Sequence, residues 1–315
     1  MSEPVSLARP PALRTGDRVA VLCASSPVEP AALNAGLDAL RFAGLDPVTY
    51  PSAHDSGTMR RYLAGDDAMR AGDLRSALTD PGIAGILFAR GGSGAQRTLE
   101  AMDWDGLVPE GPQTRLPPKV LAGFSDVTAL LEAVAVRLGW ASVFGPNIAI
   151  KEGASHYSFG SLLRTLMRPD QATVIRYPRA VTVVPGTARG VTTGGTLSLL
   201  ASSLATDTSR PARGGILLLE DVNEEDYRID RMLTQLRRSG YLDGVAGIVA
   251  GSFAGCGPPE AIQDILAERL GELHVPMITW ANVGHGGLFQ AFPYGIAAEL
   301  DAGAATLRLL DPPLS

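Results

Sequence analysis

The sequence predicts an α/β protein built from two domains, and three observations predict it. The chain has 315 residues, of which 45% are apolar and 19% charged, which is enough for a large core and, by length, for about two domains. From about residue 17 to residue 145, short apolar runs alternate with longer helical patterns, as in a mostly parallel sheet flanked by helices. After residue 151 the pattern changes to short β-rich stretches followed by mixed strands and helices. We therefore expect an N-terminal domain of residues 1–165 and a C-terminal domain of residues 166–315.

The apolar runs and the helical spacing predict the following elements. Buried strands are expected at Val19–Cys23, Ile83–Phe88, Val120–Ala122 and Ala141–Phe144, helices at Pro30–Phe42, Arg60–Leu78 and Val127–Leu138, and β-rich stretches at Thr173–Tyr177, Val181–Val184 and within Ala297–Leu310. Gly44 and Gly139 stand where helices should end. The proline-rich segment from Gly106 to Pro118 predicts a surface loop.

The composition argues against several classes of protein. The 33 acidic residues outnumber the 27 basic ones, and the basic residues are dispersed, so a nucleic-acid partner is not expected. No apolar run reaches the roughly 18 residues that would span a membrane, and none at the start resembles a signal peptide, which makes the cytoplasm the expected location. Cys23 and Cys256 are too few for a disulfide framework or a structural zinc site, and we expect both to be ordinary residues.

Ser125 lies in a predicted turn between a short apolar strand and a helix, in the segment LAGFSDVTALLEAV (residues 121–134). Such a turn exposes the serine hydroxyl above the sheet, and the free N–H groups of the helix start, beginning with that of Asp126, point toward any oxyanion formed there. The segment lacks the Gly-x-Ser-x-Gly pattern of α/β-hydrolases. The alternative is that Ser125 caps the helix and that Asp126 complements its dipole.

A second strand runs into a glycine-rich turn in the segment ILFARGGSGAQRTLE (residues 86–100). The lysine of a phosphate loop is missing, and Arg97 stands where a dinucleotide fingerprint needs a small residue. The N–H group of Gly91 or Gly92 could instead be the second donor of an oxyanion hole that faces Ser125. The turn could equally be a simple helix start.

Glu220 follows a buried apolar strand in the segment GGILLLEDVNEED, so its carboxylate should lie where water is partly excluded and could orient a histidine. The acids after it could suggest a cation site, but acids are also common in the first turn of a helix, and no histidine accompanies them. We therefore expect no metal here.

His285 lies between glycines in the segment NVGHGG, at the end of a predicted strand, where a core role is less natural. The other histidines, His54, His156 and His274, are read as surface or packing residues. A serine, a carboxylate and a histidine at three strand ends could supply nucleophile, orienting group and base, and the chain order Ser, Glu, His is a recognised solution to this geometry.

Taken together, these segments resemble the LD-carboxypeptidase family of serine peptidases, which includes muramoyltetrapeptide carboxypeptidases and microcin C self-immunity proteins. The motifs that carry the resemblance are GDRVAVLCASSPV (16–28), ARGGSGAQR (89–97), AGFSDVTAL (122–130), TTGGTLSLLASSLAT (192–206), LLLEDVNEEDYRIDRMLTQL (217–236) and NVGHG (282–286). Thr196 departs from the pattern, because the family often has asparagine after the glycine pair, and Gly286-Gly287-Leu288 stand where polar residues are common.

The resemblance implies a flavodoxin-like N-terminal domain, a β-barrel-like C-terminal α/β domain, a homodimer and a Ser-His-Glu triad at the domain interface. The nucleophile then falls on Ser125, the orienting carboxylate on Glu220 and the base on His285, with the oxyanion hole formed by the N–H groups of Asp126 and of Gly91 or Gly92. No cofactor is implied. The expected activity is hydrolysis of an L,D-peptide bond that releases D-alanine from murein tetrapeptides during peptidoglycan recycling.

Three points stay open at this stage. The substrate could instead be a peptidyl or aminoacyl nucleotide analogue, as for the microcin C immunity proteins. The residue that binds the terminal carboxylate of a small peptide substrate is not fixed, and Arg90 and Arg228 are the candidates. A non-catalytic protein of two domains that clasps a small ligand is the alternative from another class, whereas glutamine amidotransferase-like enzymes need a cysteine in the elbow, and neither cysteine here has that setting.

Overall fold

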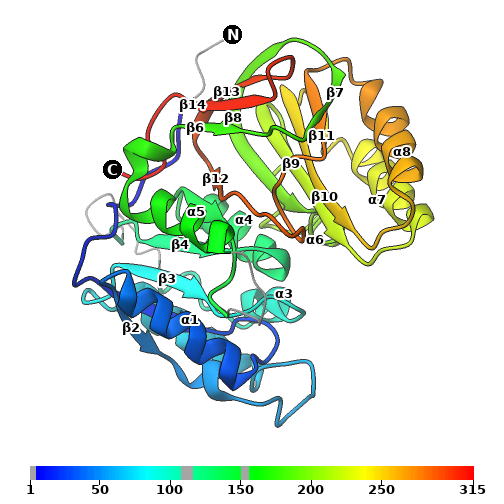
Figure 1. Cartoon of the computed structure of the whole chain (residues 1–315). Helices are drawn as coiled ribbons and strands as arrows, with labels where there is room; N and C mark the ends of the chain where they lie inside the picture. The colour runs from blue at the N-terminus through cyan, green and yellow to red at the C-terminus, as the bar shows by residue number, and fades with distance from the viewer. Residues whose placement is uncertain (1–4, 108–115, 150–155) are drawn as a thin grey trace.

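The computed structural model describes residues 5–107, 116–149 and 156–315, which form two sheets in two lobes (Figure 1). The first sheet has the strand order β12-β5-β4-β3-β1-β2. Its strands are β1 (Arg18–Leu22), β2 (Asp46–Thr49), β3 (Gly85–Phe88), β4 (Val120–Gly123), β5 (Ser142–Phe144) and β12 (Phe292–Tyr294). The first five are parallel and follow the flavodoxin-like order 2-1-3-4-5, as expected. β12 joins β5 in the antiparallel direction.

Helices cover both faces of this sheet, because each buries one apolar stripe against it. The helices are α1 (Pro30–Phe42), α2 (Asp67–Thr79), α3 (Ala95–Glu100), α4 (Thr128–Arg137) and α5 (His156–Met167), with short 3-10 turns η1 (Pro51–His54) and η3 (Pro169–Ala172). The leucines of α1 and α5 share one core with one face of the sheet, and α2, α3 and α4 pack on the other face.

The expected strands and the first helix of this lobe are confirmed, but the start of one predicted helix is wrong and one strand was not predicted. The predicted helix at Arg60–Leu78 begins only at Asp67. Gly65 before it has φ 69°, a left-handed conformation that interrupts a helix, and Asp66 is the N-cap, whose side chain accepts a hydrogen bond from the N–H of Met69. β2 was not expected, because its half-buried sequence DPVT lacks an apolar run.

The second sheet is mixed, with the strand order β6-β14-β13-β8-β9-β10-β11-β7. Its strands are β6 (Val174–Arg176), β7 (Val181–Val184), β8 (Thr187–Thr196), β9 (Gly215–Val222), β10 (Gly247–Ala254), β11 (Met277–Thr279), β13 (Ala297–Asp301) and β14 (Thr306–Leu309). α6 (Leu197–Ser202), α7 (Asp226–Arg238) and α8 (Pro259–Gly271) share a core with one face of it.

This sheet is barrel-like, because its two edges are close to each other. β6 and β7 form opposite edges, yet only residues 177–180 join them, and so short a link spans at most about 18 Å. The hydroxyl of Thr182 in β7 donates to the carbonyl of Ala302, in the turn between β13 and β14 (2.7 Å). The sheet therefore curls back on itself, as expected.

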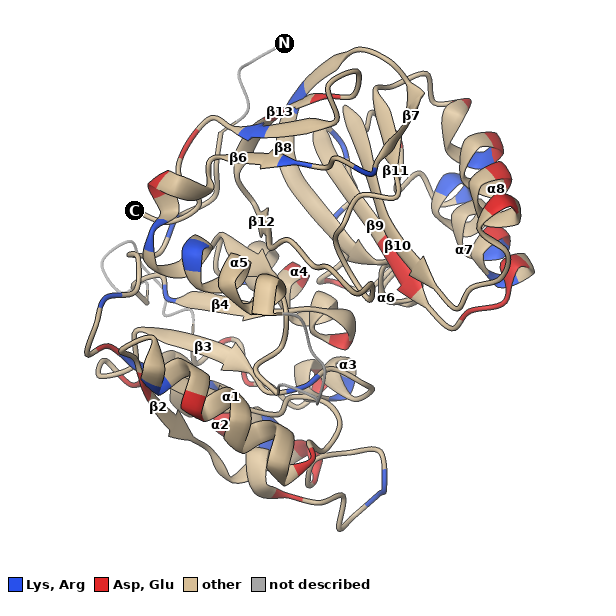
Figure 2. Cartoon of the chain, in the orientation of Figure 1, with Lys and Arg blue, Asp and Glu red and all other residues tan. Residues whose placement is uncertain are grey.

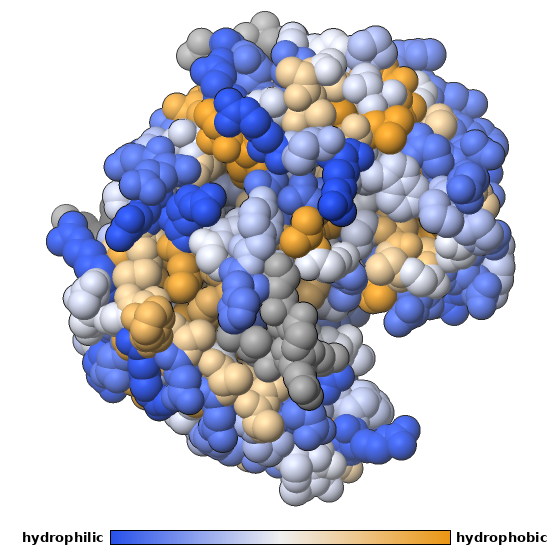
Figure 3. All heavy atoms as spheres, in the orientation of Figure 1, coloured by the Kyte–Doolittle hydropathy of each residue, from blue (hydrophilic) through white to orange (hydrophobic). Residues whose placement is uncertain are grey.

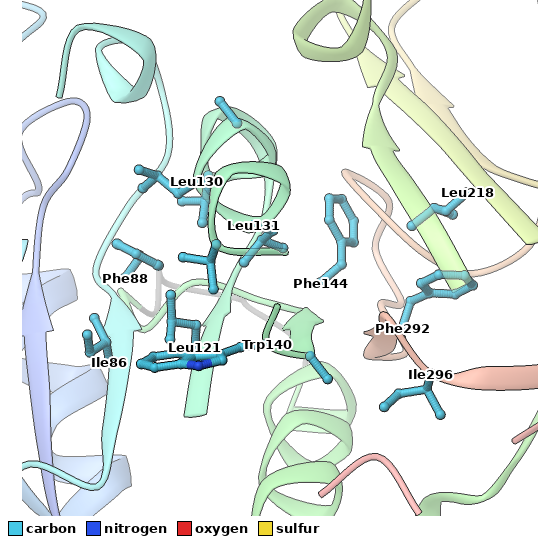
Figure 4. Close-up of a cluster of buried hydrophobic side chains, with 14 of the residues drawn as sticks. Ile86, Phe88, Leu121, Leu130, Leu131, Trp140, Phe144, Leu218, Phe292 and Ile296 are labelled. Atoms are coloured by element: carbon cyan, nitrogen blue, oxygen red, sulfur yellow. The ribbon is translucent and has the colours of Figure 1, made fainter. Parts of the chain in front are cut away.

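One continuous hydrophobic core joins the two lobes. Figure 4 shows Phe144 of β5 between Leu131 of α4 and Phe292 of β12, with Leu218 of β9 on the far side. All four side chains are buried. β12 belongs in sequence to the C-terminal half but completes the N-terminal sheet, so the two lobes are tied together by both packing and backbone pairing.

The surface between the lobes is hollowed, as Figure 3 shows on the side where the lobes part. Acidic and basic side chains both lie on α7 and α8 (Figure 2), where Arg237 pairs with Glu272 and Arg269 with Asp230. Among the described residues, no helix is long and apolar enough to cross a bilayer. Most of the predicted proline-rich loop, residues 108–115, lies outside the described residues.

Candidate active site

Ser125 occupies a strained turn directly after β4. Its φ is 65°, an uncommon conformation for a residue other than glycine, and it is the first residue of the 3-10 turn η2 (Ser125–Val127) that leads into α4. The N–H of Phe124 donates to Oδ1 of Asn147 (3.2 Å), which holds the entry to the turn. The alternative interpretation, that Ser125 caps the helix, is wrong, because Phe124 is the cap of η2 and Val127 is the cap of α4.

The glycine turn after β3 lies against Ser125. A Cβ on Gly91 would lie 2.9 Å from the Cβ of Ser125 and 3.1 Å from the carbonyl oxygen of Phe124, so no larger residue fits without a shift. Gly92 has φ 110°, and a Cβ there would lie 2.2 Å from Oγ of Ser26. That Oγ accepts a hydrogen bond from the N–H of Ser93 (3.0 Å) and therefore supports the turn from behind.

Asp126 connects the serine turn to the glycine turn. Its buried Oδ2 accepts a hydrogen bond from the N–H of Ala95, the first residue of α3 (2.7 Å). Burial raises the pKa of this carboxyl, and the hydrogen bond from Ala95 opposes that effect. The two turns that carry the predicted oxyanion donors are thus held in register by a side chain that the sequence analysis considered only as a helix-dipole partner.

Glu220 and His285 form a hydrogen-bonded pair, although 65 residues separate them. Nδ1 of His285 lies 2.7 Å from Oε2 of Glu220, and the backbone N–H of His285 donates to the same oxygen (3.0 Å). Glu220 lies in β9 and is 0% exposed. Gly284, with φ 99°, makes this approach possible, because a Cβ there would lie 2.2 Å from Oε2.

The pairing fixes which ring nitrogen of His285 can act as a base. A carboxylate can only accept, so Nδ1 carries the proton that it donates to Glu220, and Nε2 is left with its lone pair. The His285 ring lies 4.7 Å from the Phe124 ring between centroids, and Phe124 directly precedes Ser125. Within the described residues, no hydrogen bond joins the Ser125 hydroxyl to the His285 ring.

Two threonines that the sequence analysis did not place in the site connect its two halves. The hydroxyl of Thr196, at the end of β8, donates to Oε1 of Glu220 (2.5 Å). Its backbone N–H donates to Oγ1 of Thr128, the first residue of α4 (3.1 Å). The glycine pair before Thr196 was the only sign of this contact in the sequence.

The two candidate arginines make contacts that leave their predicted role untested. Arg90, next to Gly91, donates to the carbonyl of Pro27 (2.6 Å). Arg228, on the first turn of α7, pairs with Glu224, four residues earlier.

Asp221, next to Glu220, accepts hydrogen bonds from the N–H groups of Ser198 and Val222, and burial raises its pKa to about 6.

The remaining histidines and the cysteines lie outside this cluster. Nε2 of His54 bonds the hydroxyl of Thr49 (2.8 Å), and His156 is the exposed first residue of α5. Both cysteines are free and buried, and burial raises the pKa of Cys23 to about 12 and that of Cys256 to about 11. In the parts of the chain that the structure describes, no three His, Cys, Asp or Glu residues group as a metal ion would require.

Comparison with family models matches both lobes. Residues 19–145 match the N-terminal domain of LD-carboxypeptidases, and residues 189–300 match their C-terminal domain. A protein of Streptomyces coelicolor with a provisional carboxypeptidase name is 48% identical over 98% of each chain. The murein tetrapeptide carboxypeptidase of Pseudomonas aeruginosa is 31% identical over 90% of this chain and 93% of its own length.

Solved structures with the same two-lobed fold include a muramoyltetrapeptide carboxypeptidase and a microcin self-immunity protein. The muramoyltetrapeptide carboxypeptidase from Oxalobacter formigenes superposes with a TM-score of 0.76 at 25% identity, over 93% of this chain and 97% of that chain. The microcin C7 self-immunity protein MccF, solved with glutamyl sulfamoyl guanosine, reaches a TM-score of 0.85 at 20% identity, over 98% of this chain and 100% of that chain, which supports the fold alone.

Proposed function

The chain belongs to the LD-carboxypeptidase family, and we propose that it is a serine carboxypeptidase that hydrolyses an L,D-peptide bond with a triad of Ser125, His285 and Glu220. The substrate that we propose is a murein tetrapeptide, from which the enzyme releases the terminal D-alanine. The murein tetrapeptide carboxypeptidase of Pseudomonas aeruginosa, which aligns along nearly its whole length, supports this substrate class.

The observation that carries the proposal is the hydrogen bond between Glu220 and Nδ1 of His285, whose ring contacts Phe124, the residue before the serine of a strained elbow. A fully buried carboxylate on Nδ1 holds the imidazole in the tautomer that leaves Nε2 basic, and it stabilises the imidazolium that forms during the reaction. Phe124 contacts the same ring and precedes the serine, which supports a short path from Ser125 to Nε2.

In the acylation step, Nε2 of His285 takes the proton of the Ser125 hydroxyl as Oγ attacks the carbonyl carbon of the L,D-peptide bond. The N–H groups of Asp126 and of Gly91 or Gly92 donate to the oxyanion that forms. The tetrahedral intermediate then collapses, the C–N bond breaks, and the imidazolium returns its proton to the nitrogen of the leaving D-amino acid.

In the second step, His285 takes a proton from water, and the hydroxide oxygen attacks the acyl-enzyme ester. The ester C–O bond breaks, Oγ of Ser125 recovers the proton from His285, and the shortened peptide leaves with a new carboxylate. Both proposed steps use side chains, backbone N–H groups and water as their reagents.

The terminal carboxylate of the substrate should bind a cationic group or free N–H groups. We propose Arg90 as the first candidate, because it belongs to the same turn as Gly91, and Arg228 as the second. Arg90→Gln should then raise KM more than it lowers kcat, whereas an unchanged KM would remove Arg90 from this role.

We further propose that the domain boundary lies near residue 165, within a chain whose two lobes share one continuous core.

We also propose that the enzyme acts in the cytoplasm as a homodimer. Light scattering during size-exclusion chromatography would give the mass of the assembly, which we expect to be twice the 32.9 kDa of the chain.

The direct test is digestion of purified muropeptides followed by mass spectrometry. We expect tetrapeptides to become tripeptides with release of D-alanine, and we expect no conversion by a folded Ser125→Ala variant. Two outcomes would contradict the proposal: intact tetrapeptides after incubation with the wild type, or equal conversion by both proteins.

A second substrate in the same assay separates the two substrate classes of the family. An aminoacyl-sulfamoyl adenosine should be turned over far more slowly than the murein tetrapeptide. Preferential cleavage of the nucleotide analogue would retain the triad but replace the proposed substrate. Tight binding of either compound without turnover would favour a non-catalytic binding protein.

A further inference from the structure

Thr196 makes two hydrogen bonds, one to the Glu220 carboxylate and one to the start of the helix that follows Ser125. Its hydroxyl donates to Oε1 of Glu220 (2.5 Å), the carboxylate that bonds His285. Its backbone N–H donates to Oγ1 of Thr128 (3.1 Å), at the start of the helix that follows Ser125. Thr196 and Thr128 are both buried, so water does not compete for either bond.

The backbone around Thr196 is shaped for this double contact. Gly194 and Gly195 have φ values of 97° and 147°, and a Cβ on Gly195 would lie 2.7 Å from both Oγ1 and Cγ2 of Thr128. Gly195 thus allows β8 to approach α4 closely, and Gly194, where a Cβ would lie 2.1 Å from the carbonyl oxygen of Leu218, allows it to approach β9. Thr196 also pairs with Glu220 in the parallel register of β8 and β9, which places the hydroxyl beside the carboxylate.

The hydroxyl of Thr196 completes the hydrogen bonding of a buried charge. Oε2 of Glu220 already accepts two hydrogen bonds from His285. Within the described residues, Thr196 is the one donor to Oε1. Without it, a fully buried carboxylate oxygen would lack a partner, which favours rotation of the group, and that rotation would disturb the bond to Nδ1.

We propose that Thr196 is a positioning residue that orients the carboxylate of Glu220 toward His285 and, through Thr128, fixes the distance between that pair and the Ser125 elbow. This inference rests on the proposed triad. The residue after the glycine pair, here a threonine, would then act inside the protein and would not contact the substrate.

The test compares Thr196→Val, which replaces the hydroxyl by a methyl group, with Thr196→Ser, which retains the hydroxyl. We expect Thr196→Val to lower kcat about 10- to 100-fold with little change in KM, because a hydrogen bond to a charged group is lost away from the substrate. Thr196→Ser should recover most of the loss. A rise in KM with unchanged kcat would overturn the proposal, as would equal activity in Thr196→Val and the wild type.

Thr193→Val is the matched control. Thr193 lies on the same strand, is also buried, and bonds the hydroxyl of Tyr294 (3.3 Å) rather than Glu220. Its loss should lower stability without changing kcat. If both valine variants lowered kcat equally, the effect of Thr196 would be that of any buried threonine on this strand, and the positioning role would be wrong.

Two readouts need no substrate and so separate this inference from the proposed function. The Nδ1 proton of His285 should give a downfield NMR resonance that shifts in Thr196→Val and not in Thr193→Val. A fluorophosphonate should modify Ser125 more slowly in Thr196→Val. An unshifted resonance together with wild-type labelling would overturn the role of Thr196 even if the murein substrate proved correct.

Thr128→Val tests the other contact and remains informative if Thr196→Val does not fold. It leaves the Glu220 carboxylate fully bonded, so the His285 resonance should stay in place while kcat and the labelling rate of Ser125 fall. We expect the double variant to lose less than the product of the two single effects, because both bonds serve one alignment. Wild-type kcat and labelling in Thr128→Val would contradict the proposal.

Discussion

Ser125 combines a strained backbone with a close glycine, two features that a helix-capping serine does not need. The first prediction is that Ser125→Ala and His285→Ala each lower kcat by about 10⁴ to 10⁶ while the protein stays folded, as in other triads. Muropeptide turnover and circular dichroism would measure the two quantities together. A folded Ser125→Ala protein with normal turnover would contradict the assignment of the nucleophile.

Glu220 is 0% exposed, and both of its oxygens are bonded. Glu220→Gln preserves its shape but gives up the charge and one acceptor, so His285 can adopt the wrong tautomer and its charged form loses its partner. We expect turnover to fall by about 10³ to 10⁴ near neutral pH. The pH–rate profile would measure this, and a profile identical to that of the wild type would show that the carboxylate has no role in orienting the base.

Single residues were predictable from sequence where the chemistry is local to one motif. Ser125, Glu220 and His285 each end a strand pattern, and the structure does bond the last two to each other. Thr196 could not be assigned a partner, because its two bonds join strands and helices that are far apart in sequence. The interaction of Asp126 with Ala95 was missed for the same reason.

At the scale of secondary-structure elements, the turns after β3 and β4 determine where an oxyanion could be held. Gly91→Ala would place a Cβ 2.9 Å from that of Ser125 and force the two turns apart. If Gly91 or its neighbour donates to the oxyanion, kcat should fall by about 10² to 10³.

Gly72→Ala is the control for this variant, because Gly72 lies within α2 and a Cβ there would meet nothing within 4 Å. The helix should become slightly more stable, by about 0.5 to 1 kcal/mol, with unchanged turnover. Unfolding curves and kcat for both variants would test the difference, and a Gly91→Ala enzyme with wild-type kcat would remove this turn from the proposed oxyanion hole.

Helices and strands whose apolar residues repeat regularly were predictable from the sequence. Boundaries set by left-handed backbone conformations were not. α1 has the predicted bounds Pro30–Phe42 because its leucines repeat along one face. The start of α2 depends on the left-handed Gly65 and on the cap formed by Asp66, so the residues before it form a loop despite their composition. β12 is a short strand of three residues whose partner lies about 150 positions earlier, a pairing that local sequence does not encode.

At the scale of the whole molecule, Glu132 is a buried acid at the contact between the lobes. It is 1% exposed, its Oε1 accepts a hydrogen bond from the hydroxyl of Tyr241 (3.3 Å), and its Oε2 has no partner among the described residues. Burial raises its pKa from an ordinary 4.5 to about 8, against smaller opposing effects of Tyr241 and Arg210.

This raised pKa predicts a pH dependence of stability. The folded protein binds the Glu132 proton more tightly than the unfolded chain, so the contribution is fully present below about pH 4.5 and is lost as the pH rises to about 8. Glu132→Gln should remove that loss, which amounts to about 5 kcal/mol at most. Urea unfolding of both proteins at pH 5, 7 and 9 would measure it, and equal pH slopes would contradict the prediction.

The two-lobed architecture was predictable from the change of pattern near residue 151, and the family resemblance implied the barrel-like second sheet. What the sequence did not indicate is how firmly the lobes are joined. The common core, β12 and the bond between Thr196 and Thr128 all cross between the two halves, and each depends on long-range packing. That joining is what brings the turn of Ser125 in one lobe toward Glu220 and His285 of the other.

Reaction with a fluorophosphonate, followed by peptide mapping with mass spectrometry, tests most directly whether these side chains act together. We predict a single adduct on the peptide that contains Ser125 in the wild type, and a severe loss of labelling in His285→Ala and Glu220→Gln while both variants remain folded. Modification at another residue, or undiminished labelling of Ser125 without His285, would contradict the account.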